Sequence, residues 1–333
     1  MKELIKKLVE TYGPSGSEDR IRDTIKREIQ GLADEVKVDP LGNLIATRKG
    51  DGARILVAAH MDEIGVVVTF IDENGFLRFS NVGGVTPHVL LGERVVFANG
   101  TIGVCGAEKL DDIKDLKLNK MYIDIGARDR KEAEGKVSIG DAAGYWREFS
   151  DLGDRLVSKS MDDRIGCAVI IEAMRRVKNE RLPNEVCFAF TAQEEVGARG
   201  ARTVAYGVSP DIGIAVDVTG TGDTPEGWKM AVKLGAGAAI KAMDRSLVAH
   251  PKVKELLVEV ANREDIPYQI EVLEYGGTDA GSIHTSKEGV PSGVISIPAR
   301  YIHTPSELVD YGDVESCVRL LVETIKTPLK GRF

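Results

Sequence analysis

Short apolar runs that lack polar alternation restrict the possible folds of this 333-residue chain more than any other feature. The first run covers residues 55–59, and further strand-like segments cover 186–191, 212–218 and 293–297. A strand without alternation is typical of a sheet that is buried on both faces. Segments with helical periodicity alternate with these strands at 162–177, 198–206, 252–262 and 314–325. The pattern predicts an α/β fold in which helices flank a mostly parallel central sheet.

The stretch from residue 66 to residue 157 has a different texture, with short strand-like segments close together and little helical periodicity. Turn signals such as Asn74-Gly75 and Gly83-Gly84 separate these segments. We therefore expect one α/β domain, made of residues 1–65 and 158–333, that is interrupted by a small inserted β domain at 66–157. About two domains is also the expectation for a chain of this length.

The first 33 residues predict two helices. The first helix is amphipathic and does not resemble a signal peptide. Ser15, with Glu18 three residues later, is typical of a capping box that opens the second helix.

Composition excludes several classes of protein. The chain has 44 Lys and Arg against 52 Asp and Glu, a net charge of −8, which argues against nucleic-acid binding by general phosphate attraction. No apolar run approaches the roughly 18 residues that a membrane-spanning helix needs, so no membrane association is expected. The 4 cysteines are scattered without a C-x-x-C pair, which predicts reduced thiols and a cytoplasmic location.

Side chains able to bind metal ions directly follow the apolar runs. Ligands in open α/β folds gather at the carboxyl ends of the strands, so these side chains are expected to meet at one edge of the sheet. A pair of carboxylates also opens the helix predicted from residue 162, where the helix dipole favours acids. The complete set comprises His60, Asp62, Asp162, Asp163, Glu194, Glu195, Asp217 and His303.

A set of histidines and carboxylates without cysteine suits an open catalytic centre for Zn²⁺, Co²⁺ or Mn²⁺. Five ligands that include one bridging carboxylate could hold two metal ions. Because neighbouring side chains at a strand end point to opposite sides, one of Glu194 and Glu195 could ligate metal while the other acts as general base. Asp62, two residues after His60, is placed to orient the imidazole. A lone histidine at a strand end is more often packed than a ligand, but the ordered set favours a metal site.

The same residues also resemble a known family. In the order H-x-D, D-D-R-x-G, E-E-x-G, V-D and H-T-P they resemble the tetrahedral aminopeptidases, the glutamyl and leucyl aminopeptidase-like branch of the dinuclear metallopeptidases. The resemblance covers nearly the whole chain. It extends to residues 12–16, 39–43, 82–85, 276–280 and 300–305.

The resemblance implies a ligand set. One metal ion would be held by His60, Asp162 and Asp217, and the second by Asp162, Glu195 and His303, with Asp162 bridging the two. Asp162 rather than Asp163 matches the family's bridging position, because it lies four residues before Gly166.

The resemblance also implies an activity and an assembly. Glu194 would act as general base and proton shuttle, and Asp62 would orient His60, in a metal-dependent aminopeptidase that removes N-terminal residues from short peptides. The inserted unit at 66–157 matches the family's dimerisation domain, which is PDZ-like or barrel-like. Similar proteins form dimers and tetrahedral dodecamers.

Three alternatives stay open: a related metallohydrolase acting on other amides, a non-enzymatic metal-binding protein, and a glycoside hydrolase, because proteins that resemble this pattern have sometimes been labelled endoglucanases. Glycosidases have no general need for metal-binding histidines, and aromatic residues that stack on sugars make up only 5% of the chain. A purely structural metal site would not need the additional acid that Glu194 supplies.

Several other residues have weaker predictions. His88 is expected at a surface or interface, His250 as a helix cap or a pocket residue, and His284 as a packed side chain. Thr278 and Asp279 lie in a glycine-rich loop that is a candidate lining of the specificity pocket.

Overall fold

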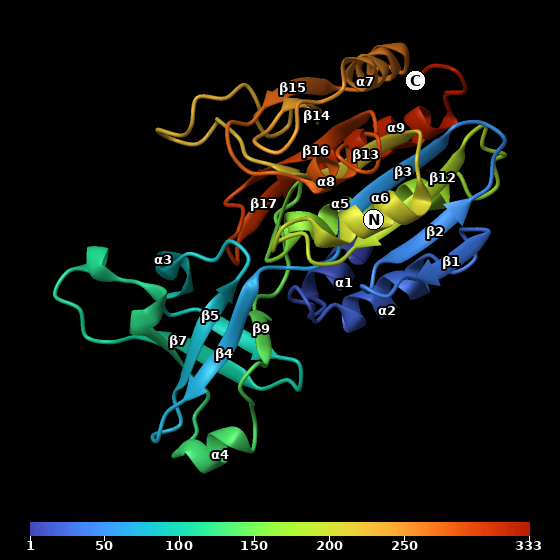
Figure 1. The fold of residues 1–333 in the computed structure, drawn as a ribbon. Helices are drawn as coiled ribbons and strands as arrows, with labels where there is room; N and C mark the ends of the chain where they lie inside the picture. Colours follow the sequence, from blue (N-terminus) through green and yellow to red (C-terminus); the bar gives the residue numbers. More distant parts are fainter.

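The computed structural model describes all 333 residues as a large α/β unit and a small closed β-barrel that projects from one end of it (Figure 1). The large unit has helices on both faces of one 11-stranded sheet. Both parts of the predicted fold class, the helix-flanked sheet and the small inserted β domain, are therefore confirmed. No helix is long and apolar enough to cross a membrane.

The centre of the large sheet is parallel, and the outer strands pair antiparallel except for β14 with β15, which are parallel. The parallel centre has the order β12-β3-β13-β16, where β3 (Arg54–His60) and β13 (Ile212–Thr219) are the innermost pair. Every residue of β13 is buried, as the apolar run predicts for a strand covered on both faces. The remaining strands are β1 (Glu35–Val38), β2 (Leu44–Arg48), β10 (Ser150–Asp151), β11 (Arg155–Ser158), β12 (Glu185–Thr191), β14 (Ala238–Met243), β15 (Tyr268–Val272), β16 (Ser292–Arg300) and β17 (Glu307–Asp310).

Helices cover the two faces of this sheet unequally. One face packs against α1 (Lys2–Glu10), α2 (Asp19–Glu28), α5 (Met161–Arg176), α7 (Pro251–Arg263) and α9 (Tyr311–Lys326), in a core of 55 buried residues. The other face carries α6 (Arg199–Val208) and α8 (Asp279–Ile283) over a core of 10 residues. Helix α5 contacts both β3 and β13, so its amino end is fixed at the carboxyl edge of the central strands.

The inserted domain is a closed barrel with the strand order β4-β5-β8-β7-β6-β9. Its core of 19 buried residues is separate from the core of the large unit. Closure leaves no free strand edge, which protects this small domain from edge-to-edge pairing. Its elements are β4 (Gly65–Ile71), β5 (Leu77–Val82), α3 (Pro87–Leu90), β6 (Arg94–Phe97), β7 (Ile102–Ala107), η1 (Ile113–Asp115), η2 (Leu118–Lys120), β8 (Met121–Asp124), α4 (Arg130–Glu134) and β9 (Ala142–Tyr145).

A buried charge cluster lies where the chain enters and leaves the barrel. The carboxylate of Glu63 contacts Nζ of Lys159 at 2.6 Å and a guanidinium nitrogen of Arg164 at 3.6 Å, and all three side chains are nearly inaccessible to solvent. Glu63 also accepts a hydrogen bond from the backbone N–H of Gly13 at 3.0 Å. The cluster therefore ties both connections of the barrel to the N-terminal segment.

The predicted capping box is wrong. Glu18 itself is the N-cap residue of α2, and no side chain caps this helix. The Glu18 carboxylate instead accepts the N–H groups of Gly16 and Gln193, and the Ser15 hydroxyl turns away to donate to Asp62. The side chains of Glu18 and Ser15 therefore form hydrogen bonds near the strand-end residues, and neither side chain caps the start of α2.

Candidate metal centre

Asp162 lies between two histidines at the centre of the candidate site. It is the second residue of α5, whereas His60 ends β3 and His303 lies in the turn between β16 and β17. The Oδ1 atom of Asp162 is 3.0 Å from Nε2 of His60, and its Oδ2 atom is 3.2 Å from Nε2 of His303. The two oxygens of one carboxylate thus face two separate imidazoles, as a carboxylate shared by two metal ions would.

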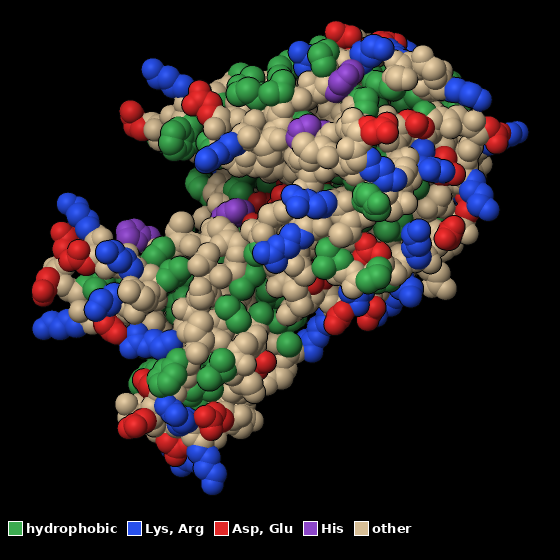
Figure 2. All heavy atoms as spheres, viewed as in Figure 1, with side chains coloured by type: hydrophobic (Ala, Val, Ile, Leu, Met, Phe, Trp, Pro, Cys, Tyr) green, Lys and Arg blue, Asp and Glu red, His purple; other side chains and the backbone are tan.

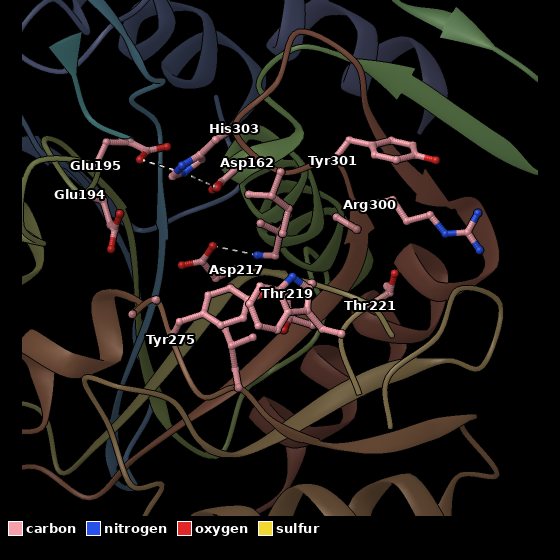
Figure 3. A pocket seen from close by; sticks show the side chains of 18 of the residues that line it. Asp162, Glu194, Glu195, Asp217, Thr219, Thr221, Tyr275, Arg300, Tyr301 and His303 are labelled. Carbon is pink, nitrogen blue, oxygen red and sulfur yellow. Dashed lines mark hydrogen bonds and ion pairs between the residues drawn. The ribbon is translucent and has the colours of Figure 1, made fainter. Parts of the chain in front are cut away.

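The adjacent acids after β12 take different positions. Oε2 of Glu195 lies 3.1 Å from Nε2 of His303, and its buried Oε1 has no hydrogen-bond partner. Oε2 of Glu194 lies 3.9 Å from Nε2 of His60, on the other side of the group. Figure 3 shows both carboxylates directed into one cavity. The two neighbouring acids therefore have different surroundings, Glu195 beside His303 and Glu194 nearest to His60.

Asp217 and the two carboxylates that open α5 complete the set of acids. Potential ligand atoms of His60, Asp163 and Asp217 lie within 4.8 Å of one another, as do those of His60, Asp162 and Glu195. Both oxygens of Asp163 already accept backbone N–H groups, from His60 at 3.2 Å and from Gly166 at 3.1 Å. Asp162 faces the cavity and Asp163 does not, so the two neighbours have separate surroundings.

Asp62 is a buried residue that contacts both His60 and the loop that carries the paired acids. Its side chain is fully buried and its Oδ1 atom lies 3.4 Å from Nδ1 of His60, while its carbonyl oxygen is 3.2 Å from the same nitrogen. Its carboxylate accepts the backbone N–H groups of Glu194 at 3.0 Å and Glu195 at 3.2 Å, and the hydroxyl of Ser15 at 2.5 Å. Asp62 therefore holds both the imidazole of His60 and the loop that carries the paired acids.

Glu307 is a residue that the sequence reasoning missed. It starts β17, is buried, and accepts the backbone N–H of Asp162 at 2.9 Å and that of His303 at 2.7 Å. One side chain thus fixes the backbones of two site residues that are far apart in the sequence. Its signal was present as the acid four residues after His303, separated from the H-T-P segment by Ser306.

A loop of the barrel packs against two residues of the same site. A Cβ atom added to Gly84, in the loop after β5, would lie 2.3 Å from Nδ1 of His303, and one added to Gly83 would lie 3.1 Å from Cβ of Glu195. The positive φ of 76° at Gly83 also favours glycine. These two glycines let the barrel loop approach both side chains closely.

Burial and mutual repulsion dominate the electrostatics of the acids. Burial raises the pKa of Glu194 well above its ordinary value, and the charges of Asp217 and Asp279 raise it further. For Asp162 burial acts in the same direction, but the contacts with His303 and His60 outweigh it and the pKa is lowered. So many buried carboxylates need compensating positive charge, which divalent ions would supply.

A cavity of about 890 Å³ opens above these residues. Figure 2 shows a hollow in the surface with acidic and histidine side chains inside it, and all of the residues that line the cavity belong to the large unit. The glycine-rich loop lines this cavity through Gly276 and Gly277, whereas Thr278 and Asp279 are buried and do not line it. Asp279 instead accepts a hydrogen bond from the hydroxyl of Thr191, and burial raises its pKa to about 6.

The other three histidines lie outside the site. His88 is exposed in the short helix α3 of the barrel. His250 is the N-cap residue of α7, but its side chain forms no capping hydrogen bond and its buried Nδ1 has no partner. His284 is half-buried, with Nδ1 3.0 Å from the carbonyl oxygen of Ala280 in the preceding turn.

A group of histidines and carboxylates at the carboxyl ends of parallel strands, inside a large cavity, is typical of a metallohydrolase. The family model described as M42 glutamyl aminopeptidase matches residues 42–320. The chain is 36% identical to the lysyl aminopeptidase of Pyrococcus furiosus over 341 residues, which cover 97% of both chains.

Solved structures agree with this match. A TET aminopeptidase from a marine sediment archaeon, Thaumarchaeota archaeon SCGC AB-539-E09, superposes with a TM-score of 0.95 at 38% identity, over 99% of this chain and 98% of that one. The TET1 peptidase of Pyrococcus horikoshii, described as assembling into a tetrahedron or a large octahedral shell, gives a TM-score of 0.88 at 36% identity, over 97% and 98%. The chain belongs to the M42 glutamyl aminopeptidase family. It is a metal-dependent aminopeptidase of the TET type.

Proposed function

We propose that the enzyme holds two divalent ions, zinc, cobalt or manganese. His60 and Asp217 would hold the first ion and Glu195 and His303 the second, with Asp162 shared between them. The observation that carries this assignment is the position of the Asp162 carboxylate, whose two oxygens face different histidines at 3.0 Å and 3.2 Å.

Two features support the fit of metal to these residues. The contacts among His60, Asp162, Glu195 and His303 range from 3.0 to 3.2 Å, close to the edge of about 3.3 Å in a tetrahedron with metal–ligand bonds of about 2.0 Å. The buried Oε1 atom of Glu195 has no hydrogen-bond donor, as expected for an oxygen that would bind a cation.

When bound, the metal pair would lower the pKa of a water molecule and polarise the scissile carbonyl. Glu194 is placed to do the proton transfer. Its Oε2 atom takes the proton from the attacking water, holds it in a buried environment and delivers it to the nitrogen of the leaving amine. Asp62 orients the imidazole of His60 throughout, and Glu307 keeps the backbones of Asp162 and His303 in place.

The substrates we propose are short peptides with a free amino terminus. The cavity, with a volume of about 890 Å³, is large enough for one or two residues beside the reacting bond. The acids are placed in contact with imidazoles rather than as a pair flanking a sugar, which gives no support to glycoside hydrolysis.

Metal removal and return tests this function. Chelation followed by dialysis should abolish hydrolysis of leucine p-nitroanilide, and Zn²⁺, Co²⁺ or Mn²⁺ should restore it at about two ions per chain by elemental analysis. N-acetyl-leucine p-nitroanilide and carboxymethylcellulose are the comparison substrates. Turnover that survives verified metal removal, or preference for the blocked substrate or the cellulose derivative, would contradict the proposal.

We also propose that the barrel domain, residues 66–157, is the dimerisation unit of a tetrahedral dodecamer in the cytoplasm. The exposed β-branched residues Ile102 and Val104 lie two apart on the outer face of β7 and offer an apolar surface. All four cysteines are free and buried, which suits a reducing compartment.

Sedimentation velocity of the full chain tests the assembly. Replacing Ile102 and Val104 together by Asp should lower the oligomeric state. The matched control replaces Val36 and Val38, which are similarly exposed two apart on β1 of the large sheet. A monomeric wild-type protein, or dissociation caused only by the control pair, would exclude the barrel as the interface.

A further inference from the structure

The part of the cavity beyond the metal centre is almost uncharged. Its side chains include Thr221, Trp228, Leu273, Tyr275 and Ile302. Arg300 is the only charged residue among the lining residues that does not belong to the His and carboxylate group. Figure 3 shows Arg300 across the cavity from Glu194 and Glu195, with its guanidinium directed away from them.

Arg300 is itself neutralised by a bidentate ion pair. Its Nε atom donates to Oδ1 of Asp223 at 3.0 Å, and a terminal nitrogen donates to Oδ2 at 2.7 Å. Asp223 is held in place by a further hydrogen bond from the backbone N–H of Leu234 at 3.1 Å. The parallel fork of two bonds is the strong, directional form of this interaction. The guanidinium therefore has little free charge to offer a substrate carboxylate.

Exposed aromatic surface lies on the same wall. The rings of Trp228 and Tyr275 are 5.8 Å apart, and the two residues are 72% and 44% exposed. An apolar side chain that enters the cavity would cover this surface, which is favourable because apolar area leaves water. A charged side chain would lose hydration there and find no unpaired partner.

We infer that the cavity selects peptides whose N-terminal side chain is apolar and uncharged, and that Asp223 sets this preference by neutralising Arg300. The inference rests on the proposed function, because it assumes that the cavity above the metal centre receives the N-terminal side chain. Asp223 acts here through Arg300 and is a specificity-determining positioning residue.

The test compares kcat/KM for the p-nitroanilides of leucine, phenylalanine, lysine and glutamate with the metal-loaded enzyme. The wild type should favour leucine and phenylalanine over lysine and glutamate by roughly tenfold or more. Asp223→Asn frees the guanidinium, so the glutamate-to-leucine ratio should rise by about tenfold while the lysine-to-leucine ratio does not rise. Asp51→Asn is the matched control, because Asp51 pairs with Arg181 on the exposed surface and should leave every ratio unchanged.

Arg300→Gln provides a second, independent variant if Asp223→Asn does not fold. It leaves the carboxylate of Asp223, beside the lining residue at position 300, without its cation, so the lysine-to-leucine ratio should rise instead. Wild-type enzyme that cleaves the lysine or glutamate substrate as fast as the leucine one would overturn the inference. So would folded variants with unchanged ratios. Absence of hydrolysis of all four substrates by metal-loaded wild type would instead be a failure of the proposed function.

Discussion

The Oδ1 atom of Asp62 accepts a hydrogen bond from the backbone N–H of Glu194 at 3.0 Å. The same carboxylate lies 3.4 Å from Nδ1 of His60, so one buried acid links a proposed ligand with the proposed general base. This link makes Asp62 more than an orienter of the imidazole, which was all that its spacing in the sequence indicated.

Replacing Asp62 with Asn should weaken metal binding and catalysis together. The amide keeps one acceptor oxygen but turns an NH₂ group toward an N–H donor or toward the imidazole. Loss of a carboxylate behind a metal-binding histidine typically costs roughly 10- to 100-fold in metal affinity. Competition with a chromogenic chelator gives the metal Kd, and unchanged affinity together with unchanged kcat would remove this role.

Glu194→Gln should keep its metal ions and lose most of its turnover. A positioned general base contributes roughly 100- to 10,000-fold to the rate, and the amide cannot accept the proton. Elemental analysis should show the wild-type metal content while kcat falls by that factor. Loss of metal in this variant would show instead that Glu194 is a ligand.

Gly84→Ala should disturb His303 without unfolding the protein. The added methyl group would overlap the imidazole, at 2.3 Å from Nδ1, so the ring or the barrel loop must move. We expect weaker binding of one of the two metal ions and a lower kcat with little change in Tm. Gly207→Ala in α6 is the control, because its added Cβ has no neighbour within 4 Å. Equal activity of the two variants would count against close contact between loop and ligand.

Glu63→Gln should destabilise the fold by about 3–5 kcal/mol near neutral pH, because it leaves Lys159 and Arg164 buried without their acid. Burial alone would raise the pKa of Glu63, but the charges of Lys159 and Arg164 outweigh it and hold the pKa below its ordinary value of 4.5. The stabilisation is therefore complete above about pH 4.5 and is lost as the pH falls through the lowered pKa.

Urea unfolding of wild type and Glu63→Gln between pH 4 and pH 8 checks this dependence. The difference in the free energy of unfolding should be constant at the higher pH values and should shrink only at the acid end. Asp51→Asn serves as the exposed control and should stay within roughly 0.5 kcal/mol of wild type throughout. A difference that instead grew in acid would contradict the lowered pKa.

The strand-end residues could be predicted because the physics of parallel sheets is visible in the sequence. The apolar run that ends in His60 marks a buried strand and the sheet edge where that strand stops. Asp217 lies near the end of a second apolar run and marks the same edge. Ser15, Gly84 and Glu307 could not be found in this way. They reach the site from a loop before α2, from the barrel and from an antiparallel strand, and their positions depend on how these elements pack. The prediction of a capping box was wrong for the same reason. Ser15 and Glu18 form tertiary hydrogen bonds instead of the local hydrogen bonds that would cap the helix.

The proposed ligands are dispersed along the chain from residue 60 to residue 303 and lie on separate strands, loops and a helix. No short segment contains a complete binding site, so an unfolded chain would have little affinity for the ions. Their binding free energy would then favour the native state and raise its resistance to heat and proteases in proportion to the logarithm of metal concentration. The same ions would thus act as a cross-link that joins the barrel-flanking segments to the C-terminal third of the protein.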